Sequence, residues 1–395
     1  MDALMTTLPK DWEIKTFRDI STINQGLQIP ISQRLKAPTE HAKFYITIQA
    51  LNNRKEFEYI KTYNESVVCH KDDILMTRTG NTGMVITNIE GVFHNNFFKI
   101  NFDRTLINKD FLVYFLSLEQ TQRTILKKAG TSTIPDLNHN DFYSLTIPLP
   151  SLNEQNAIAN ILSALDRYLC TLDALILKKE GVKKALSFEL LSQRKRLKGF
   201  NQAWQRVRLG DICEIGNGGA YETLIVENGD FKLISLNSID IDGNLKNTMK
   251  RVNFYDNSLK QDDIVMVLSD VAHGDFLGLC AVIPSNDYVL NQRMGRLRIR
   301  NDCINILFLR LYINANQKYF KMQGQGSSQL NLSKKSIEDF EIPLPPLNEQ
   351  IAIANILSAL DKEIASLKNK KRQFENIKKT LNHDLMSAKI RVLKK

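Results

Sequence analysis

Residues 148–166 read PLPSLNEQNAIANILSALD, and residues 343–361 read PLPPLNEQIAIANILSALD. The second stretch begins 343 − 148 = 195 positions after the first, and residues 147–166 and 342–361 share 18 of 20 positions. Duplication is the simplest explanation, because this period is far longer than the roughly 20 to 50 residues of stacked repeat proteins. The chain therefore consists of two related halves.

A fainter repeat precedes each copy. WEIKTFRDISTINQG begins at Trp12 and WQRVRLGDICEIGNG begins at Trp204, and five identical residues align between them. A chain of 395 residues also exceeds what one hydrophobic core usually organises. We predict globular domains over residues 1–146 and 199–341, a central helical segment over 147–198 and a C-terminal helical segment over 342–395.

Each repeated stretch is predicted to open a long amphipathic helix. Prolines precede it, and apolar residues then recur at spacings of three, four and seven. They are Leu165, Leu169, Leu172, Ile176, Leu186 and Leu190 in the first half, and Leu360, Ile364, Leu367, Phe374, Leu381 and Leu385 in the second. Asn153 and Asn348 are the predicted N-caps, and Gly181 is a predicted weak point.

The apolar stripe of such a helix needs a cover, and the other copy is the natural candidate. Antiparallel pairing would place one domain near each end of a rod, with approximate two-fold symmetry. The variable regions mix short alternating runs with helical patches, which is typical of α+β structure. The predicted fold is two mixed α/β domains joined by two long helices in an antiparallel coiled coil.

The net charge of +10 favours a polyanionic partner. Residues 166–200 and 361–395 hold 20 of the 53 basic residues and only 8 of the 43 acidic ones, so the rest of the chain is nearly neutral. These lysine-rich segments could contact phosphate, dock partners or keep the helices solvated. The sequence shows neither a membrane-spanning run nor a secretory signal, so we expect a cytoplasmic protein.

Catalytic motifs are not found in the sequence. It contains no phosphate-binding loop, no HExxH pair, no GxSxG elbow and no Asn-Pro-Pro-Tyr or Asp-Pro-Pro-Tyr motif for a flipped base. The five cysteines are scattered without a CxxC pair, which argues against disulfides and zinc. Cys69 and His70 alone make a weak ligand cluster. We predict a chain that is not an enzyme and binds no cofactor or metal.

Polar, glycine-rich loops stand at corresponding places in the two halves. They are residues 76–83 (MTRTGNTG) and 130–141 (GTSTIPDLNHND), and residues 268–278 (LSDVAHGDFLG) and 324–335 (GQGSSQLNLSKK). Arginine can pair with guanine, and asparagine or glutamine with adenine. The alternative is ordinary turns whose glycines supply positive φ. We favour recognition, because the loops differ while the framework around them is shared.

The pattern IPLPxLNEQxAIANILSALD, followed by a long helix ending in LLSQRKRLKGF, closely resembles the DNA-specificity subunit of type I restriction-modification systems. The openings at Trp12 and Trp204 also resemble the start of that family's target recognition domains, with Phe17 where the second half has Leu209. The resemblance covers essentially the whole chain. It implies a non-catalytic subunit whose two domains each read one half of a bipartite site in double-stranded DNA.

The same resemblance implies partners. The helices would space the readers, about one DNA turn or roughly 34 to 36 Å apart, and dock two modification subunits. Those subunits would bind S-adenosylmethionine and methylate adenine, and restriction subunits would use ATP and Mg for translocation and cleavage. The predicted DNA contacts are Arg78, Asn81 and Thr133 for one half-site and His273, Ser328 and Gln329 for the other. The predicted partner contacts are Asn153, Glu154, Gln155, Asn348, Glu349 and Gln350.

Other interpretations stay open at this point. One is a coiled-coil interaction scaffold displaying two protein-binding domains, which would bind a modification subunit without any selective DNA protection. Another is an unrecognised nuclease or methyltransferase, which would transfer a methyl group as the purified chain. A third keeps the family but places the chain in a modification-only or fused system, which neighbouring genes would decide.

Overall fold

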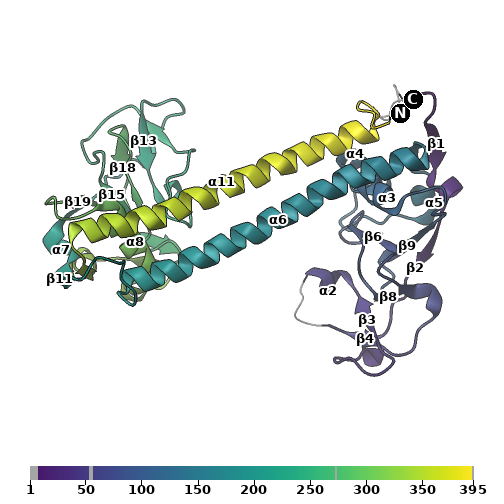
Figure 1. The fold of residues 1–395 in the computed structure, drawn as a ribbon, viewed down its shortest axis with the longest axis horizontal. Coiled ribbons are helices and arrows are strands. Elements are labelled where there is room, and N and C mark those ends of the chain that lie inside the picture. Colours follow the sequence, from purple (N-terminus) through teal and green to yellow (C-terminus); the bar gives the residue numbers. More distant parts are fainter. Residues whose placement is uncertain (1–7, 53–56, 272–273, 394–395) are drawn as a thin grey trace. The chain divides into compact units, whose positions relative to one another are not determined.

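A computed structural model describes residues 8–52, 57–271 and 274–393. The chain divides into two compact units, which are residues 1–173 with 369–395 (unit 1) and residues 174–368 (unit 2). The two long helices are α6 (Leu152–Leu191) and α11 (Leu347–Met386), drawn in teal and yellow in Figure 1. Each helix contributes residues to both units, and the predicted domain bounds stay a prediction.

Unit 1 contains two four-stranded sheets. The order β2-β9-β6-β7 is antiparallel throughout, and the order β4-β3-β8-β5 has one parallel pair, β3 with β8. The strands are β2 (Ser21–Gln25), β3 (Lys43–Ile46), β4 (Tyr59–Ile60), β5 (Val68–Cys69), β6 (Ile74–Thr77), β7 (Val85–Ile86), β8 (Gly91–Phe93) and β9 (Phe97–Phe102). The shorter helices are α1 (Phe17–Ile20), α2 (Ile48–Asn52), α3 (Lys109–Leu116), α4 (Glu119–Ala129) and α5 (His139–Tyr143).

Unit 2 repeats this plan. The antiparallel order β12-β19-β15-β17 corresponds to the first sheet of unit 1, and β14-β13-β18 again contains a parallel pair. The strands are β12 (Cys213–Asn217), β13 (Phe231–Ile234), β14 (Arg251–Val252), β15 (Ile264–Val267), β17 (Cys280–Val282), β18 (Tyr288–Leu290) and β19 (Met294–Ile299). The shorter helices are α7 (Leu209–Ile212), α8 (Ile306–Ala315), α9 (Gln317–Gln323) and α10 (Lys334–Glu338). The predicted α+β class is confirmed.

The repeated openings and the repeated prolines meet in short ladders. Strand β1 (Glu13–Thr16) pairs antiparallel with β10 (Thr146–Leu149), and β11 (Gln205–Arg208) pairs the same way with β21 (Glu341–Leu344). Each ladder joins the start of a domain to the strand that leads into a long helix. This pairing fixes the direction in which the helix leaves its domain.

The long helices begin two residues earlier than predicted. The backbone N–H of Gln155 donates to the carbonyl of Ser151 at 2.9 Å, and that of Gln350 donates to the carbonyl of Pro346 at 3.0 Å. The residue whose carbonyl accepts the first helical bond is the N-cap, so Asn153 and Asn348 lie inside the first turn and the predicted caps are wrong. Helix α6 also continues through Gly181 without a break.

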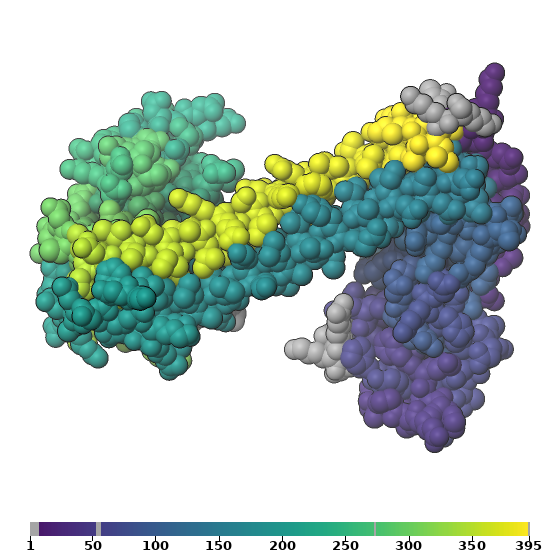
Figure 2. All heavy atoms as spheres, in the orientation of Figure 1, coloured from purple at the N-terminus to yellow at the C-terminus, as the bar shows by residue number. Residues whose placement is uncertain are grey.

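In each unit the start of one long helix packs beside the end of the other, as the adjoining teal and yellow spheres of unit 1 show in Figure 2. Ile158, Ala159 and Leu162 join Leu385 and Met386 in the core of unit 1. The residues at the same repeat positions do the same in unit 2, and they are Ile353, Ala354, Leu357, Leu190 and Leu191. Burying each leucine contributes about 1.5 to 3 kcal/mol. The antiparallel pairing of the helices is confirmed.

Cross-helix ion pairs fill the gaps in the apolar seam. Lys371 binds Asp173 at 2.7 Å, and Lys378 binds Asp166. Lys183 binds Asp361 in the equivalent place in unit 2. These lysines therefore have carboxylate partners within the chain. No helix among residues 8–52, 57–271 and 274–393 is both long and apolar enough to cross a membrane.

Candidate nucleic-acid interface

The two polar loops of the first half come together in unit 1. Loop A1 (residues 78–83) follows β6, and loop B1 (residues 130–138) joins α4 to α5. Thr79 Oγ1 donates to Asp136 Oδ1 at 2.6 Å, and Thr82 Oγ1 donates to the carbonyl of Pro135 at 2.7 Å. The N–H of Leu137 donates to the carbonyl of Arg78 at 2.9 Å. Two segments that are distant in sequence thus form one surface.

The polar loops of the second half come together in unit 2. Loop A2 (residues 268–271) follows β15 and contains β16 (Ser269–Val271), and loop B2 (residues 324–332) follows α9 and contains β20 (Gln329–Asn331). The two strands pair antiparallel, with Val271 opposite Gln329 and Ser269 opposite Asn331. The hydroxyl of Ser269 donates to the side-chain oxygen of Asn331.

The two loop pairs occupy equivalent places in the fold. The N–H of Leu332 donates to the carbonyl of Leu268 at 2.8 Å, as Leu137 does to Arg78 in unit 1. The chain also turns in the same way beyond these contacts, because Gly83 at the end of loop A1 and Gly278, which follows loop A2, both adopt positive φ, at +89° and +78°. A shared backbone frame therefore presents different side chains in the two units.

Several predicted contact residues are available at these loops. Asn81, Thr133 and Ser328 are exposed, and Gln329 is half-buried. None of these four side chains hydrogen-bonds to a residue in the described part of the chain. Their hydrogen-bonding groups are therefore not used by the described residues. His273 lies outside the described residues.

Arg78, one of the predicted DNA contacts, is engaged within unit 1. Its guanidinium binds Asp136 at 2.7 Å and lies over the ring of Phe98 at 5.6 Å, and only 19% of its side chain is exposed. Such a side chain braces loop A1 against loop B1 and has little freedom to pair with guanine. This geometry supports a bracing role for Arg78, and its contact with DNA stays a prediction.

A bracing role predicts that Arg78→Ala and Asp136→Ala both loosen the two loops and weaken site discrimination, because both lose the ion pair. Asp136→Ala should have the larger effect, because it also loses the hydrogen bond from Thr79. The double variant should add little to Asp136→Ala, because the ion pair is already lost. Hydrogen exchange of the Leu137 amide together with DNA binding checks this. Direct guanine reading by Arg78 would instead leave discrimination intact in Asp136→Ala.

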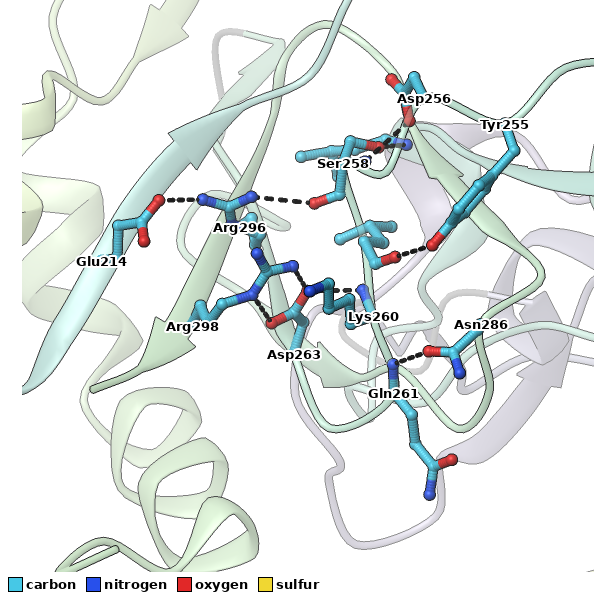
Figure 3. A network of polar contacts seen from close by, with 12 residues as sticks. Glu214, Tyr255, Asp256, Ser258, Lys260, Gln261, Asp263, Asn286, Arg296 and Arg298 are labelled. Carbon is cyan, nitrogen blue, oxygen red and sulfur yellow. Dashed lines mark hydrogen bonds and ion pairs between the residues drawn. The ribbon is translucent and has the colours of Figure 1, made fainter. Parts of the chain in front are cut away.

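The arginines of β19 are also engaged within unit 2. Figure 3 shows Arg298 bound to Asp263, at 2.8 Å from Nε and 2.6 Å from Nη2, and Arg296 bound to Glu214 and to the carbonyl of Ser258. Asp263 is buried and also accepts the N–H of Lys260 at 2.7 Å. Its hydrogen bond raises the pKa of Arg298. This network holds the strands that carry loop A2 in place.

Glu154, one of the predicted partner contacts, is buried in unit 1. It accepts hydrogen bonds from the indole N–H of Trp12 at 3.1 Å and from Arg391 at 2.7 and 3.0 Å. Arg391 also binds Asp11 at 2.9 Å, and these hydrogen bonds, that to Asp11 first, raise its pKa. The first turn of α6 is thereby fastened to the domain and to the segment that follows α11.

Unit 2 contains an equivalent set of contacts. We call each set a clamp, formed by Trp12, Glu154 and Arg391 in unit 1 and by Trp204, Glu349 and Arg196 in unit 2. Glu349 accepts from the indole of Trp204 at 3.0 Å and from Arg196 Nε at 3.1 Å, and its side chain is 0% exposed. Arg196 and Arg391 lie 391 − 196 = 195 positions apart, so the clamp is part of the duplication. The hydrogen bond to Glu349 raises the pKa of Arg196.

The glutamines beside these glutamates are buried as well. Gln155 accepts the N–H of Asn108 at 2.9 Å and donates to the carbonyls of Leu106 and Pro150. Gln350 makes the corresponding bonds to Asn305, Cys303 and Pro345. The polar groups of Glu154, Gln155, Glu349 and Gln350 are therefore used inside the chain, and partner contact by these four residues stays a prediction. Only Asn153 and Asn348 of the predicted set are exposed.

The repeated segment nevertheless keeps an exposed stripe. Asn153, Asn160 and Ala164 are exposed on α6, and the identical residues Asn348, Asn355 and Ala359 are exposed on α11. Spacings of seven and four place each set on one helix face. Packing explains why the buried positions are identical in the two copies. It does not explain identity at these exposed ones.

Buried thiols take no part in this surface. Burial raises the pKa of Cys69 and of Cys213 to about 12, so neither forms the reactive thiolate at neutral pH. The described residues also contain no group of histidine, cysteine and acidic side chains arranged to hold a metal ion.

Comparisons with known proteins agree with this organisation. The profile of the family described as "Type I restriction modification DNA specificity domain" matches residues 9–179 and again residues 201–376. The MjaVIII specificity subunit of a type I restriction enzyme from Methanocaldococcus jannaschii is 27% identical, over 98% of this chain and 94% of that protein.

Solved structures share the fold. The S subunit of a type I restriction-modification system from M. genitalium aligns with a TM-score of 0.65 and 20% identity, over 98% of this chain and 99% of that one. A chain from a structure of the complex assembly and conformational transition of the type I R-M system aligns with a TM-score of 0.58 and 16% identity, over 96% of this chain and 98% of that one.

Proposed function

Because the chain belongs to the type I restriction-modification DNA specificity family, we propose that each of its units reads one half of a bipartite DNA site through its paired loops. The observation that carries this proposal is the shared loop frame with different side chains. Thr79 and Asp136 in unit 1 stand where Ser269 and Asn331 stand in unit 2. A duplicated reader with altered contacts is suited to two different half-sites.

The family accounts for the missing catalytic motifs. Specificity subunits are non-catalytic, and they determine the DNA target within a complex with partner subunits. S-adenosylmethionine and ATP are bound by the modification and restriction subunits of such systems. The proposal also places the protein in the cytoplasm, because the DNA that it would read lies there.

Removing the free polar groups of one loop pair is expected to relax the sequence preference at one half-site only. The variant Asn81→Ala with Thr133→Ala tests unit 1, and the variant Ser328→Ala with Gln329→Ala tests unit 2. Each lost base contact should cost roughly 1 to 3 kcal/mol of discrimination. Methylome sequencing in the presence of the modification subunit gives the motif of each variant. Two variants that relax the same half, or neither half, would contradict the proposal.

We assign the docking of modification subunits to the exposed stripe, one on each long helix. The stripe is identical in the two copies although the domains have diverged, as expected if both copies bind the same protein. Asn153, Asn160 and Ala164 would form one docking site, and Asn348, Asn355 and Ala359 the other. Two equal sites correspond to two modification subunits for each chain.

A bulky charge on the stripe is expected to block docking. Ala164→Arg and Ala359→Arg should each remove one modification subunit from the complex, and the double variant should remove both, because arginine prevents close contact. Native mass spectrometry counts the subunits. Ala185→Arg is the matched control, because Ala185 is exposed on α6 outside the repeated segment. Unchanged stoichiometry in the double variant would place docking elsewhere.

A further inference from the structure

An exposed apolar side chain stands beside a free amide on the loops of unit 2. Val271 ends β16 with 68% of its surface exposed, and it lies directly opposite Gln329 of β20. Directly opposed residues of antiparallel strands have Cβ atoms about 4.5 to 5.5 Å apart, with both side chains on one face. The Gln329 amide makes no hydrogen bond to a described residue. The two side chains therefore form one small surface, apolar on one side and hydrogen-bonding on the other.

We propose that Val271 and Gln329 together read one A·T base pair in the half-site of unit 2, an inference that rests on the proposed function. An amide can donate to N7 and accept from the N6 amino group of adenine, and an apolar group can contact the thymine C5-methyl. Both features lie on the major-groove edge of a single A·T pair. A G·C pair offers no methyl group and a different order of donors and acceptors.

The shape of the valine indicates contact with the groove edge. Its side chain is short and branched at Cβ, so it has few rotamers and little reach. Side chains that act as wedges between base steps are usually longer, such as phenylalanine, leucine or methionine. Val271 therefore meets the methyl group without unstacking the base pairs.

The backbone around Val271 is held in place before any DNA binds. The carboxylate of Asp270 accepts the N–H of Val271 at 2.8 Å and that of Phe276 at 2.7 Å. The carbonyl of Val271 accepts the N–H of Gly274 at 2.8 Å. These bonds and the β16-β20 ladder reduce the entropy lost on binding, which favours affinity.

Unit 1 differs at this position. Counting back from the equivalent residues Asp136 and Asn331 places Ile134 where unit 2 has Gln329, and Ile134 is 62% exposed. An isoleucine cannot make the hydrogen bonds of an amide. The two half-sites should therefore differ at the base pair that faces this position.

Modified bases test the proposal one atom group at a time. The chain in complex with its modification subunit is bound to duplexes in which each thymine of the unit 2 half-site is replaced in turn by uracil, and each adenine by 7-deazaadenine. One uracil should weaken wild-type binding about fourfold through the lost methyl contact. 7-Deazaadenine in the same base pair should weaken it about fivefold or more through the lost N7 acceptor.

Variants then assign each loss to its residue. Val271→Ala should be insensitive to that uracil, and Gln329→Ala should be insensitive to that 7-deazaadenine. Ile134→Ala, an exposed branched residue of the other unit, is the matched control and should keep both sensitivities. Equal uracil sensitivity in wild type and Val271→Ala, or effects in two different base pairs, would overturn the inference while leaving the proposed function intact. A wild-type complex without any sequence preference would overturn both.

Discussion

Replacing Glu349 with alanine is expected to lower the free energy of unfolding of unit 2 by about 3 to 5 kcal/mol. The substitution removes a fully buried carboxylate and leaves Arg196 and the indole N–H of Trp204 without their acceptor. Leaving a buried polar group without its partner costs more free energy than the hydrogen bond itself contributed. The start of α11 should detach from the domain that carries loops A2 and B2.

The two tryptophans allow the unfolding of each unit to be measured separately. The chain contains only Trp12 and Trp204, one in each clamp. In a Trp12→Phe background, the fluorescence of Trp204 follows the denaturation of unit 2. Glu363→Ala is the control, because its ion pair with Lys179 is partly exposed and should cost less than about 1 kcal/mol. Equal denaturation midpoints of unit 2 in Glu349→Ala and Glu363→Ala would show that the clamp does not stabilise this unit.

Lengthening both long helices by seven residues is expected to lengthen the unread spacer of the DNA site by about three base pairs. Seven residues add about 10 Å of helix, and base pairs rise by about 3.4 Å. Insertions after Asp173 in α6 and after Lys368 in α11 fall at the boundary between the units. A heptad keeps the apolar seam in register.

Methylome sequencing of this double insertion variant gives both the spacer and the half-sites. The half-sites should stay unchanged, because the loops that would read them are not altered. A seven-residue insertion in only one helix is the control, and it should abolish methylation by disrupting the pairing of α6 with α11. Altered half-sites, or an unchanged spacer, would contradict a spacing role for the helices.

The duplication made much of this fold predictable. Two copies of one amphipathic pattern predicted the long helices and their mutual packing, and the sequence also placed polar loops at corresponding positions of the two halves. Of the predicted DNA contacts, Asn81 and Thr133 are exposed. The ion pair of Arg78 could not be predicted from local pattern, because the aspartate that binds this arginine lies 58 positions away, on the other loop.

The clamps could not be found from local pattern. Arg196 reaches Glu349 across 153 positions, and Arg391 reaches Glu154 across 237. A glutamate in the first turn of a helix normally faces solvent and the helix dipole, and the partner surface predicted for the repeated Asn-Glu-Gln followed from the family resemblance. Its glutamate and glutamine are buried because the β1-β10 and β11-β21 ladders bring each domain's tryptophan onto the helix start.

The apolar residues of the loops were missed for a related reason. Valine and isoleucine between strands are normally read as core residues. Their exposure follows from the pairing of β16 with β20 and from the contacts of loop B1, neither of which a local pattern contains.

The central claim is that this chain selects the DNA sequence that its partner methylates. Long-read methylome sequencing tests it in a methylation-deficient host that expresses the chain with its modification subunit, compared with the modification subunit alone. We expect methylated adenines in one split motif only when the chain is present. A stable complex that adds no new methylated motif would contradict the claim.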